Sequence, residues 1–530
     1  MGKKPPPPLL TKRIMLQKEN QPQRNIVEDI IEASLFDIYH FEDLIYVWLI
    51  DDKGGLYLLT DIFHPEIYAD ASPELLRKLV KRLRDLDALA GEPTFVTRRH
   101  FYENQPLKVL RIEVSRPSVL RRIRSRLFAF YDKMDIYHSD LEIPMNYMYS
   151  KNLYPLARVR VKVAPFNRIS SIELVDSIGD LEYPLPPLKE VHFYLKYTHR
   201  LPLTPESLGK EITHQNGSRK SPLNSLFIRF SQNGVQSEPV EISFQNPPKA
   251  LRLINSLMLR HDPDILLSAY GDQAIFPQLF YLAKRFHIPL NLDRDTTPYM
   301  DRKIVRTGSS YQSYGNTIFR APSYPLYGRW HIDSANSFVM KESRLRGVIE
   351  LARLTRFPVQ RLARSSTGIA LTYLETRTAF EDGYLVPWQK SRLEEEKSAY
   401  ELLVNDKGGL IYQPAFASTE NETLVGNSLP KIYQPPNIYE NVVQIDFSQM
   451  YPSIMVNHNI SPETVNCLCC KNDTTPLVPE IEYRICTKRK GVVSKTLAAL
   501  LERRRYYKTR IKEIKKELGL LKDRFVENPN

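Results

Sequence analysis

Residues 441–465, NVVQIDFSQMYPSIMVNHNISPETV, constrain the fold of this chain more than any other stretch. The apolar, β-branched run at 442–445 is typical of a short buried strand. Asp446 follows this run directly, so the pattern predicts a carboxylate at the end of a rigid element. Pro452 breaks the run, and a new segment starts behind it. Such a carboxylate suits Mg²⁺, which prefers carboxylate together with phosphate oxygens. A strand that ends in an acidic turn is the simpler alternative for an isolated aspartate.

The string DFSQMYPSI at 446–454 closely resembles the first palm motif of family B DNA polymerases, usually written DFxSLYPSI. The trailing HNISPET matches the family as well. The resemblance implies that Asp446 is catalytic and binds two Mg²⁺ ions, and that the carbonyl of Phe447 completes one coordination sphere.

The same resemblance implies a nucleotide pocket directly behind the metal ligand. The backbone amides of Gln449, Met450 and Tyr451 would line the triphosphate site. The ring of Tyr451 would lie under the sugar, where it would clash with a 2′-hydroxyl and favour deoxynucleotides. Gln449 and Met450 stand where the family has Ser and Leu. Methionine is a mild replacement for leucine, whereas glutamine is larger than serine and alters that pocket contact.

At about 100–200 residues per domain, 530 residues suggest three or four domains. The resemblance implies a multidomain α/β and α+β fold that is polymerase-like, with an RNase H-like exonuclease domain, a partial palm and the first fingers helix. We expect a mobile tail over 1–25, an N-terminal domain over 26–187, an exonuclease-like domain over 188–395, a partial palm over 396–488 and the start of the fingers over 489–530.

Hydrophobic periodicity gives the expected elements of the N-terminal domain. Two helices are expected at 73–89 and 117–134, and their Lys/Arg-rich faces indicate either a solvated surface or phosphate contact. Residues 137–161 resemble the segment that precedes the exonuclease domain in the polymerase family. Strands are expected at 44–51, 56–63, 94–99 and 109–114.

The exonuclease-like region departs from its family at the metal ligands. Proofreading hydrolysis needs four carboxylates around two metals. Asp272 lies near the second motif and is the one candidate substitute that the sequence offers. The expected ligand positions are occupied by Tyr194 and Lys196 in the first motif and by Ile275 in the second. Around the third motif, Ser343 and Gly347 stand where the family has Tyr and Asp. We therefore predict a retained fold without nuclease chemistry.

A glycine pair lies upstream of the palm motif, in KGGLIYQP at 407–414. The string resembles the connector between the exonuclease and polymerase domains of the family. This resemblance implies that Gly408 and Gly409 let the backbone approach the DNA template closely. A Gly-Gly pair alone would indicate only a turn in a loop.

The segment 491–530 carries leucines near helical spacing among many basic residues, which predicts a long basic amphipathic helix. It resembles the first fingers helix of the family, with Ser494 in place of the usual proline. The resemblance implies that Arg504 meets the incoming triphosphate, with Arg503 and Lys508 as neighbours, because a guanidinium offers paired donors to phosphate oxygens. A solvated basic face is the alternative.

The four cysteines are bunched at Cys467, Cys469, Cys470 and Cys486. A disulfide framework would be spread over a small secreted chain, so reduced thiols in an intracellular protein fit better. The spacing could supply three or four thiolates to a structural Zn²⁺. It lacks the paired C-x₂-C knuckles of the strongest zinc patterns, so isolated reduced cysteines are the alternative.

Composition is typical of a globular protein, with 42% hydrophobic and 25% charged residues. The formal net charge of +13 favours a polyanionic partner. No window approaches the roughly 18 uninterrupted apolar residues of a membrane span, and the opening MGKKPPPPLLTKR lacks the apolar core of a secretory signal. We expect an intracellular protein without a membrane partner, cytoplasmic and nucleoid-associated if prokaryotic.

By resemblance, the polymerase site is half complete. The family carries a second metal-binding aspartate in a Tyr-x-Asp-Thr-Asp hairpin and a lysine in a second fingers helix, and neither string occurs in the sequence. We expect the N-terminal part of a DNA polymerase, split or truncated, which acts on primer–template DNA and deoxynucleoside triphosphates in replication or repair. A second polypeptide with the rest of the palm, fingers and thumb would complete it. The alternative is a non-catalytic DNA-binding scaffold derived from a polymerase.

Overall fold

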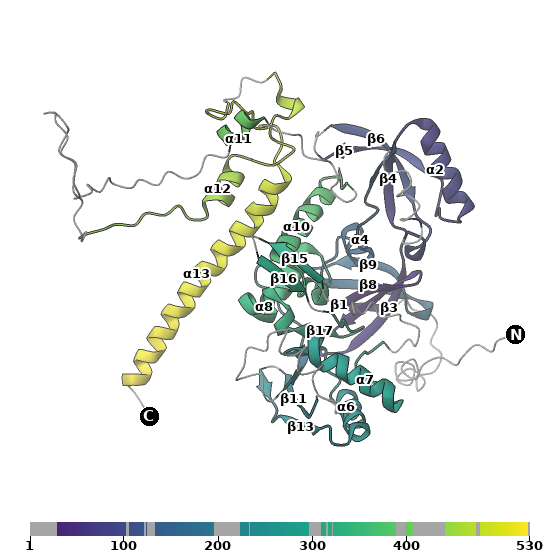
Figure 1. Ribbon diagram of the computed structural model, residues 1–530, viewed down its shortest axis with the longest axis vertical. Coiled ribbons are helices and arrows are strands. Elements are labelled where there is room, and N and C mark those ends of the chain that lie inside the picture. The colour runs from purple at the N-terminus through teal and green to yellow at the C-terminus, as the bar shows by residue number, and fades with distance from the viewer. Residues whose placement is uncertain are drawn as a thin grey trace, which may run out of the picture. The chain divides into compact units, whose positions relative to one another are not determined.

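The protein is described from a computed structural model. Contacts divide the chain into two compact units, residues 1–101 with 106–389 and residues 102–105 with 390–530; Figure 1 shows both as ribbons. The structure describes residues 29–101, 105–120, 123, 133–195, 223–232, 234–295, 309–313, 316–320, 322–387, 398–405, 440–472 and 477–527.

A closed barrel lies at the start of the first unit, with strand order β1-β2-β3-β9-β8. Neighbouring strands pair antiparallel except β3 and β9, which meet in parallel at Thr60 and Arg168. The strands predicted at 44–51 and 56–63 are confirmed as β2 and β3. The barrel strands are β1 (Asp29–Phe41), β2 (Leu44–Ile50), β3 (Leu56–Ile62), β8 (Arg158–Ala164) and β9 (Arg168–Leu174).

A second sheet follows the order β18-β5-β6-β4-β7 and carries helix α2 (Pro73–Asp85). The helix begins where Ser72 Oγ accepts the Leu75 N–H at 3.5 Å, with a proline in the first turn. The predicted helix at 73–89 and the predicted strands at 94–99 and 109–114 are thus confirmed, whereas most of 117–134 lies outside the described residues. The strands are β4 (Glu66–Asp70), β5 (Thr94–His100), β6 (Pro106–Glu113), β7 (Asp135–Tyr137) and β18 (Tyr384–Leu385).

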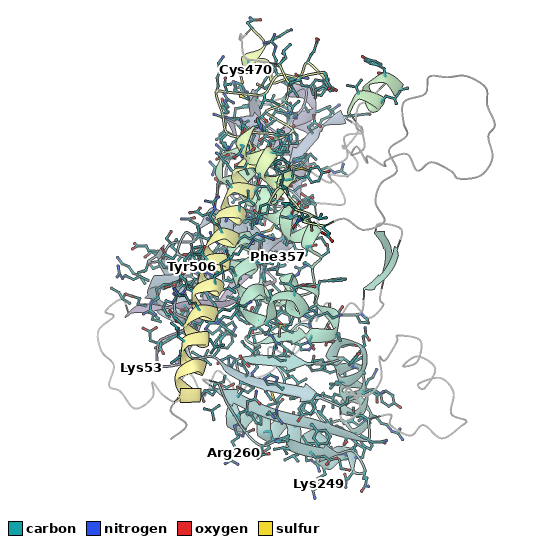
Figure 2. The ribbon with its side chains drawn as sticks, turned by 90° about the vertical axis from the view of Figure 1, so that its left-hand side faces the viewer. Lys53, Lys249, Arg260, Phe357, Cys470 and Tyr506 are labelled. Atoms are coloured by element: carbon teal, nitrogen blue, oxygen red, sulfur yellow. The ribbon has the colours of Figure 1, made fainter. Side chains whose placement is uncertain are left out.

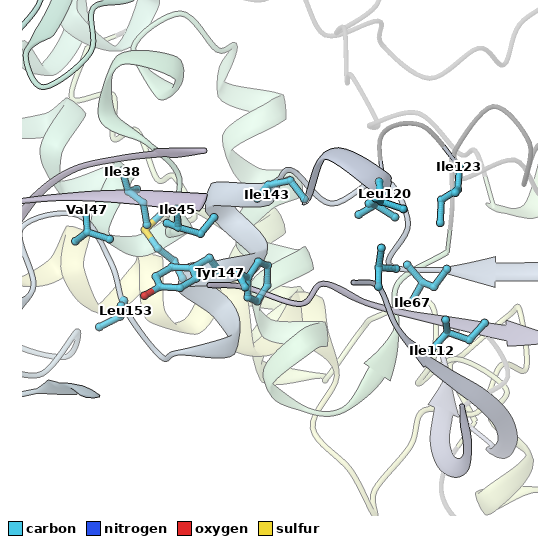
Figure 3. Packing of buried hydrophobic residues seen from close by; sticks show 14 of the residues in the cluster. Ile38, Ile45, Val47, Ile67, Ile112, Leu120, Ile123, Ile143, Tyr147 and Leu153 are labelled. Atoms are coloured by element: carbon cyan, nitrogen blue, oxygen red, sulfur yellow. The ribbon is translucent and has the colours of Figure 1, made fainter. Parts of the chain in front are cut away.

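One hydrophobic core joins the barrel and this second sheet. Ile45 of the barrel and Ile67 and Ile112 of the sheet are fully buried in the same cluster. Tyr147 from α4 (Ile143–Ser150) lies in that cluster as well (Figure 3), and its hydroxyl donates to Asp61 Oδ2 at 2.7 Å. Because buried side chains of the barrel, of the second sheet and of α4 belong to one continuous cluster, this N-terminal region packs as a single body.

A mixed sheet with strand order β12-β11-β10-β14-β17 forms the exonuclease-like part of the first unit. Strands β10, β14 and β17 are parallel, and helices follow β14 and β17 along the chain, as in α/β folds. The strands are β10 (Lys189–Tyr194), β11 (Ser225–Gln232), β12 (Val235–Gln236), β13 (Val240–Ser243), β14 (Ile265–Ser268) and β17 (Trp330–Asp333). The main helices are α6 (Pro247–His261), α7 (Phe276–Phe286), α8 (Phe338–Thr355), α9 (Val359–Leu362) and α10 (Thr367–Glu381), and a hairpin joins β15 (Ser309–Ser313) to β16 (Asn316–Arg320).

The second unit consists of α11 (Ala399–Asn405), α12 (Met450–Asn457), a 3₁₀ turn at Leu468–Cys470 and the long α13 (Val492–Glu527). The long helix that the sequence predicts at 491–530 is therefore confirmed. Among the helices that the structure describes, none combines the length and the apolar composition that crossing a membrane requires.

The strand predicted at 442–445 is wrong for this structure. Residues 442–447 form neither a helix nor a strand, and no described strand pairs with them. Val443 and Ile445 are 79% and 87% exposed. A strand needs neighbouring strands for its amides and a packed layer for its side chains, and the described residues provide neither at this segment. The expected domain boundaries stay predictions.

Candidate active site

The candidate metal ligand Asp446 is exposed and lies just before the turn that begins α12. Gln449 adopts the left-handed conformation, with φ 55° and ψ 47°, directly before the first residue of α12. The Ser453 N–H donates to the Gln449 carbonyl at 2.9 Å and closes the first turn. The first amides of a helix have no partner within it, so the amides of Met450 and Tyr451 suit an anionic ligand.

Apolar side chains surround this turn without being buried. Phe447 is 77% and Tyr451 71% exposed, and no side chain of α12 is buried. The single carboxylate of Asp446, with the neighbouring carbonyl oxygens, offers hard oxygen ligands of the kind that Mg²⁺ takes. These donors would occupy only part of one coordination sphere, so any site here is completed by other groups.

The start of α13 is capped by the HNISPET segment, which follows α12. The Val492 N–H donates to Glu463 Oε1 at 2.5 Å, and the Val493 N–H donates to Ser461 Oγ at 3.2 Å. The hydroxyl of Ser461 in turn donates to Glu463 Oε2 at 2.5 Å. A buried carboxylate at a helix N-terminus satisfies unpaired amides and meets the positive end of the helix dipole. The HNISPET match thus has a structural role that sequence reasoning missed.

Ser494, which replaces the proline of the family pattern, ties the two helices together. Its side chain is fully buried, and its hydroxyl donates to the Met455 carbonyl at 2.9 Å. Met455 lies in α12. A proline has no hydroxyl with which to make this contact. The hydrogen bond holds the helix that follows Asp446 against the first turn of α13.

Arg504 and Lys508 are both exposed on α13, and they share one face because residues four apart lie one above the other. At about 1.5 Å per residue, Arg504 lies about 18 Å along the helix from its start. Arg503 is 9% exposed and is turned about 100° away from Arg504. The role of Arg503 as a neighbour of the phosphate site stays a prediction. Figure 2 shows the side chains along this helix, with Tyr506 labelled.

In the exonuclease-like part, the candidate substitute Asp272 lies in the helical turn Gly271–Ile275 that follows β14, and its side chain is fully buried. Arg364 donates to its carboxylate from Nε at 2.7 Å and from Nη2 at 3.1 Å. The Tyr324 N–H and the Asn336 side chain donate to the same carboxylate at 2.9 Å each. Burial alone would raise the pKa of Asp272, but the positive charge of Arg364 and these hydrogen bonds hold that pKa below its ordinary value. Its oxygens are therefore occupied without any metal.

Asp333 and His331, which lie beside Asp272, are also buried and hydrogen-bonded within the fold. The Asp333 carboxylate accepts the backbone N–H groups of Tyr270 and Asp272, each at 2.9 Å, and burial raises its pKa to about 6. Burial lowers the pKa of His331 to about 3, so its ring is neutral at pH 7. The ring contacts the hydroxyl of Ser268 at 2.8 Å. We name Asp272, His331, Asp333 and Arg364 the buried ionic cluster.

The first-motif and third-motif positions have no acids either. Tyr194 ends β10 and lines a cavity of about 340 Å³, and the described side chains around this cavity, among them His192, Arg229 and Ser268, include no carboxylate. Lys196 lies outside the described residues. A Cβ atom at Gly347 would lie 2.1 Å from the Cβ of Ser343, so α8 leaves no room for a carboxylate there.

The four cysteines that the sequence singles out are brought together, with all four Sγ atoms within 4.8 Å of one another. Within the part of the chain that the structure describes, they form the only group of three or more His, Cys, Asp or Glu side chains close enough to share one metal. The glycines Gly408 and Gly409 lie outside the described residues.

Comparisons with known proteins agree with this geometry. The profile of DNA polymerase family B matches residues 429–523, which include Asp446 and Arg504. DNA polymerase 1 of Pyrococcus abyssi is 21% identical over 511 residues, covering 88% of this chain and 58% of that protein. DNA polymerase 2 of Saccharolobus solfataricus is 33% identical over 172 residues, covering 32% of this chain and 22% of that protein.

The fold agrees as well. The solved structure of the family B DNA polymerase from the hyperthermophilic archaeon Pyrobaculum calidifontis matches with a TM-score of 0.58 and 20% identity, over 92% of this chain and 64% of that chain. The chain therefore spans about three fifths of the length of the Pyrococcus abyssi and Pyrobaculum calidifontis polymerases. The profile match at 429–523 and the similarity along most of the sequence show that this chain resembles the DNA polymerases of family B.

Proposed function

We propose that this chain is the N-terminal part of a template-directed DNA polymerase, with nucleotidyl transfer as its reaction. The observation that carries the proposal is the turn at Asp446–Gln449, which sets an exposed carboxylate just ahead of the unpaired amides of α12. Nucleotidyl transfer depends on charge neutralisation and positioning more than on covalent chemistry by the protein. A carboxylate for Mg²⁺ beside amides for a triphosphate meets both needs.

Asp446 and the Phe447 carbonyl would hold Mg²⁺, which when bound would neutralise charge on the phosphates. One carboxylate cannot hold two such ions. In this proposal the second aspartate comes from polypeptide beyond residue 530, either a continuation of the chain or a separate subunit. The ring of Tyr451 would lie under the deoxyribose and exclude a 2′-hydroxyl, and Gly408 and Gly409 would approach the template.

The basic face of α13 would contact the triphosphate of the incoming nucleotide. Arg504 and Lys508 share one face of a helix whose start is bonded to α12 through Ser494 and to the segment after α12 through Glu463. This connection gives the two cations a defined position relative to the Asp446 turn. A guanidinium is suited to the task because its planar donors match phosphate oxygens.

An exposed apolar stripe on α13 supports the need for further polypeptide. Tyr507, Ile511, Ile514, Leu518 and Leu521 are each 37–53% exposed. Their spacing alternates between four and three residues, which is the pattern of a helix that packs against another helix. In the proposal, a second fingers helix covers this stripe, and palm strands cover the exposed 442–447 segment.

In this proposal, the exonuclease-like part keeps its fold but has no nuclease activity. Its candidate acid Asp272 is paired with Arg364, and Tyr194 stands at the cavity where the family has a ligand. Hydrolysis by two metals needs several free carboxylates. We therefore assign no proofreading reaction to this chain.

Primer extension tests the proposal. The 530-residue chain alone should not extend a primed template, whereas the chain combined with a polypeptide that carries the second fingers helix, the Asp-Thr-Asp hairpin and the thumb should add deoxynucleotides. Asp446→Ala should then lower the rate by about 1,000-fold, because metal-assisted charge stabilisation is worth several kcal/mol. Glu440→Ala, at an exposed carboxylate six residues upstream, is the matched control. Unchanged extension by Asp446→Ala would favour the DNA-binding scaffold instead.

A further inference from the structure

The four cysteines come from two chain segments that pair through their backbones. The Cys486 N–H donates to the Thr464 carbonyl and the Asn466 N–H donates to the Arg484 carbonyl, each at 2.8 Å. This pairing brings Cys486 next to the 3₁₀ turn Leu468–Cys470, which follows Cys467. Figure 2 labels Cys470 in this turn. The segments therefore form a small hairpin whose inner face is made of sulfur.

The sulfur positions fit a single metal ion. Cys469 Sγ lies 3.3, 3.6 and 3.9 Å from the Sγ atoms of Cys467, Cys486 and Cys470, and Cys470 Sγ lies 3.8 Å from Cys486 Sγ. A tetrahedron of sulfurs about 2.3 Å from one Zn²⁺ has edges of about 3.8 Å. A disulfide would need about 2.0 Å, and all four cysteines are free.

The hairpin also has too little apolar material to hold itself together. Its core cluster consists of Cys467, Cys470 and Cys486, with Cys469 packed against it. Small folds without a sufficient hydrophobic core are commonly held by a metal or by disulfides. A metal would therefore supply the stabilisation that apolar burial does not.

We propose that Cys467, Cys469, Cys470 and Cys486 bind one Zn²⁺ as a closed, structural tetrathiolate site. An iron–sulfur cluster distributes its cysteines over several irons and would hold their sulfurs farther apart than one ion does. Four thiolates around Zn²⁺ carry a formal charge of −2. The flanking Lys471, Lys488, Arg489 and Lys490 offset it, and Lys488 Nζ donates to the Cys469 carbonyl at 2.7 Å.

The zinc would fix the start of α13. The Asn459 side chain donates to the carbonyls of Cys486 and Arg489 at 2.8 and 2.7 Å, and its oxygen accepts the Gly491 N–H at 2.7 Å. The hairpin is therefore bonded on one side to the residues that follow α12 and on the other to the first turn of α13. This role is structural, and it does not rest on the proposed polymerase activity.

Metal analysis of the full chain, purified without chelators, tests the site. We expect one zinc per chain, no inorganic sulfide, and after exchange into Co²⁺ the visible absorption of a tetrahedral cobalt–thiolate. Cys470→Ser should lose the bound zinc, while Lys471→Ser, at the exposed neighbouring residue, should keep it. If the cysteine variant does not fold, zinc stoichiometry and the cobalt spectrum of the wild-type chain decide alone.

Three results would overturn the proposal. The first is a wild-type chain that neither contains zinc nor takes up Zn²⁺ or Co²⁺ in stoichiometric amount. The second is iron with inorganic sulfide in place of zinc. The third is a disulfide between any two of the four cysteines in the zinc-free, freshly purified protein.

Discussion

The exonuclease-like region and the segment of the proposed palm each carry one aspartate that the sequence singles out as a candidate metal ligand, but the two carboxylates have opposite surroundings. Asp272 is fully buried and accepts hydrogen bonds from Arg364, Tyr324 and Asn336. Asp446 is exposed, ahead of a helix N-terminus. A guanidinium therefore neutralises the first carboxylate inside the fold, while the second remains accessible to a cation from solution. An aspartate near a family metal position indicates metal binding only where no neighbouring cation already pairs with its carboxylate.

The largest expected effect lies in the buried ionic cluster. Arg364→Met should lower the free energy of unfolding by about 3–5 kcal/mol, because it leaves the buried charge of Asp272 without its partner. Asp446→Ala should change stability by less than about 0.5 kcal/mol, since the side chain is exposed. Urea denaturation measures both. Arg361→Met, at a half-exposed arginine paired with Glu142, is the matched control. Equal stability of the Arg364 and Arg361 variants would show that Arg364 does not neutralise a buried charge on Asp272.

Acid should reveal the same cluster through His331. Its folded pKa is about 3 and its unfolded pKa about 6.5, so between these values the unfolded state binds more protons and stability falls as pH falls. The maximum slope is about 1.4 kcal/mol per pH unit. Asp333, with a folded pKa of about 6, acts in the opposite direction between about pH 6 and 3.8.

His331→Gln should remove the histidine contribution to this pH dependence. Between pH 6.5 and 4, the variant should lose less stability than the wild type, as measured by urea denaturation at each pH. His64→Gln, at an exposed histidine, should leave the wild-type slope unchanged. Parallel curves for His331→Gln and wild type would show that the ring titrates normally in the fold.

The sequence predicted individual helices and strands better than it predicted which distant residues pack against them. Local periodicity was sufficient for β2, β3, α2 and α13. It failed at 442–445, because burial of a strand depends on partners distant in sequence. It also could not reveal that Arg364 neutralises Asp272, since 92 residues separate them. Likewise, Glu463 caps a helix 29 residues downstream, which no local capping pattern indicates.

A smaller effect is expected from the exposed arginine of the palm and fingers region. In the reconstituted polymerase, Arg504→Ala should raise the KM for deoxynucleotides by about 10–100-fold, since a hydrogen bond to a charged group is worth about 1.5–3 kcal/mol. Unlike Arg364→Met, it should leave the free energy of unfolding unchanged within about 0.5 kcal/mol. Arg505→Ala, about 100° around the same helix, is the control. Equal KM changes for the two variants would indicate a general effect of charge on α13.

For nuclease activity we expect no effect at all. Labelled single-stranded DNA incubated with the chain and Mg²⁺ or Mn²⁺ should not be shortened, because Tyr194, Ile275 and Gly347 offer no metal ligand and Asp272 is held by Arg364. Asp272→Asn should therefore leave the background unchanged, although it should destabilise the fold as Arg364→Met does. A ladder of products that survives re-purification and disappears in Asp272→Asn would mean that this carboxylate exchanges its guanidinium for a metal. Asp272 and Asp446 would then both bind metal, and they would differ only in that Arg364 pairs with Asp272 when no metal is bound.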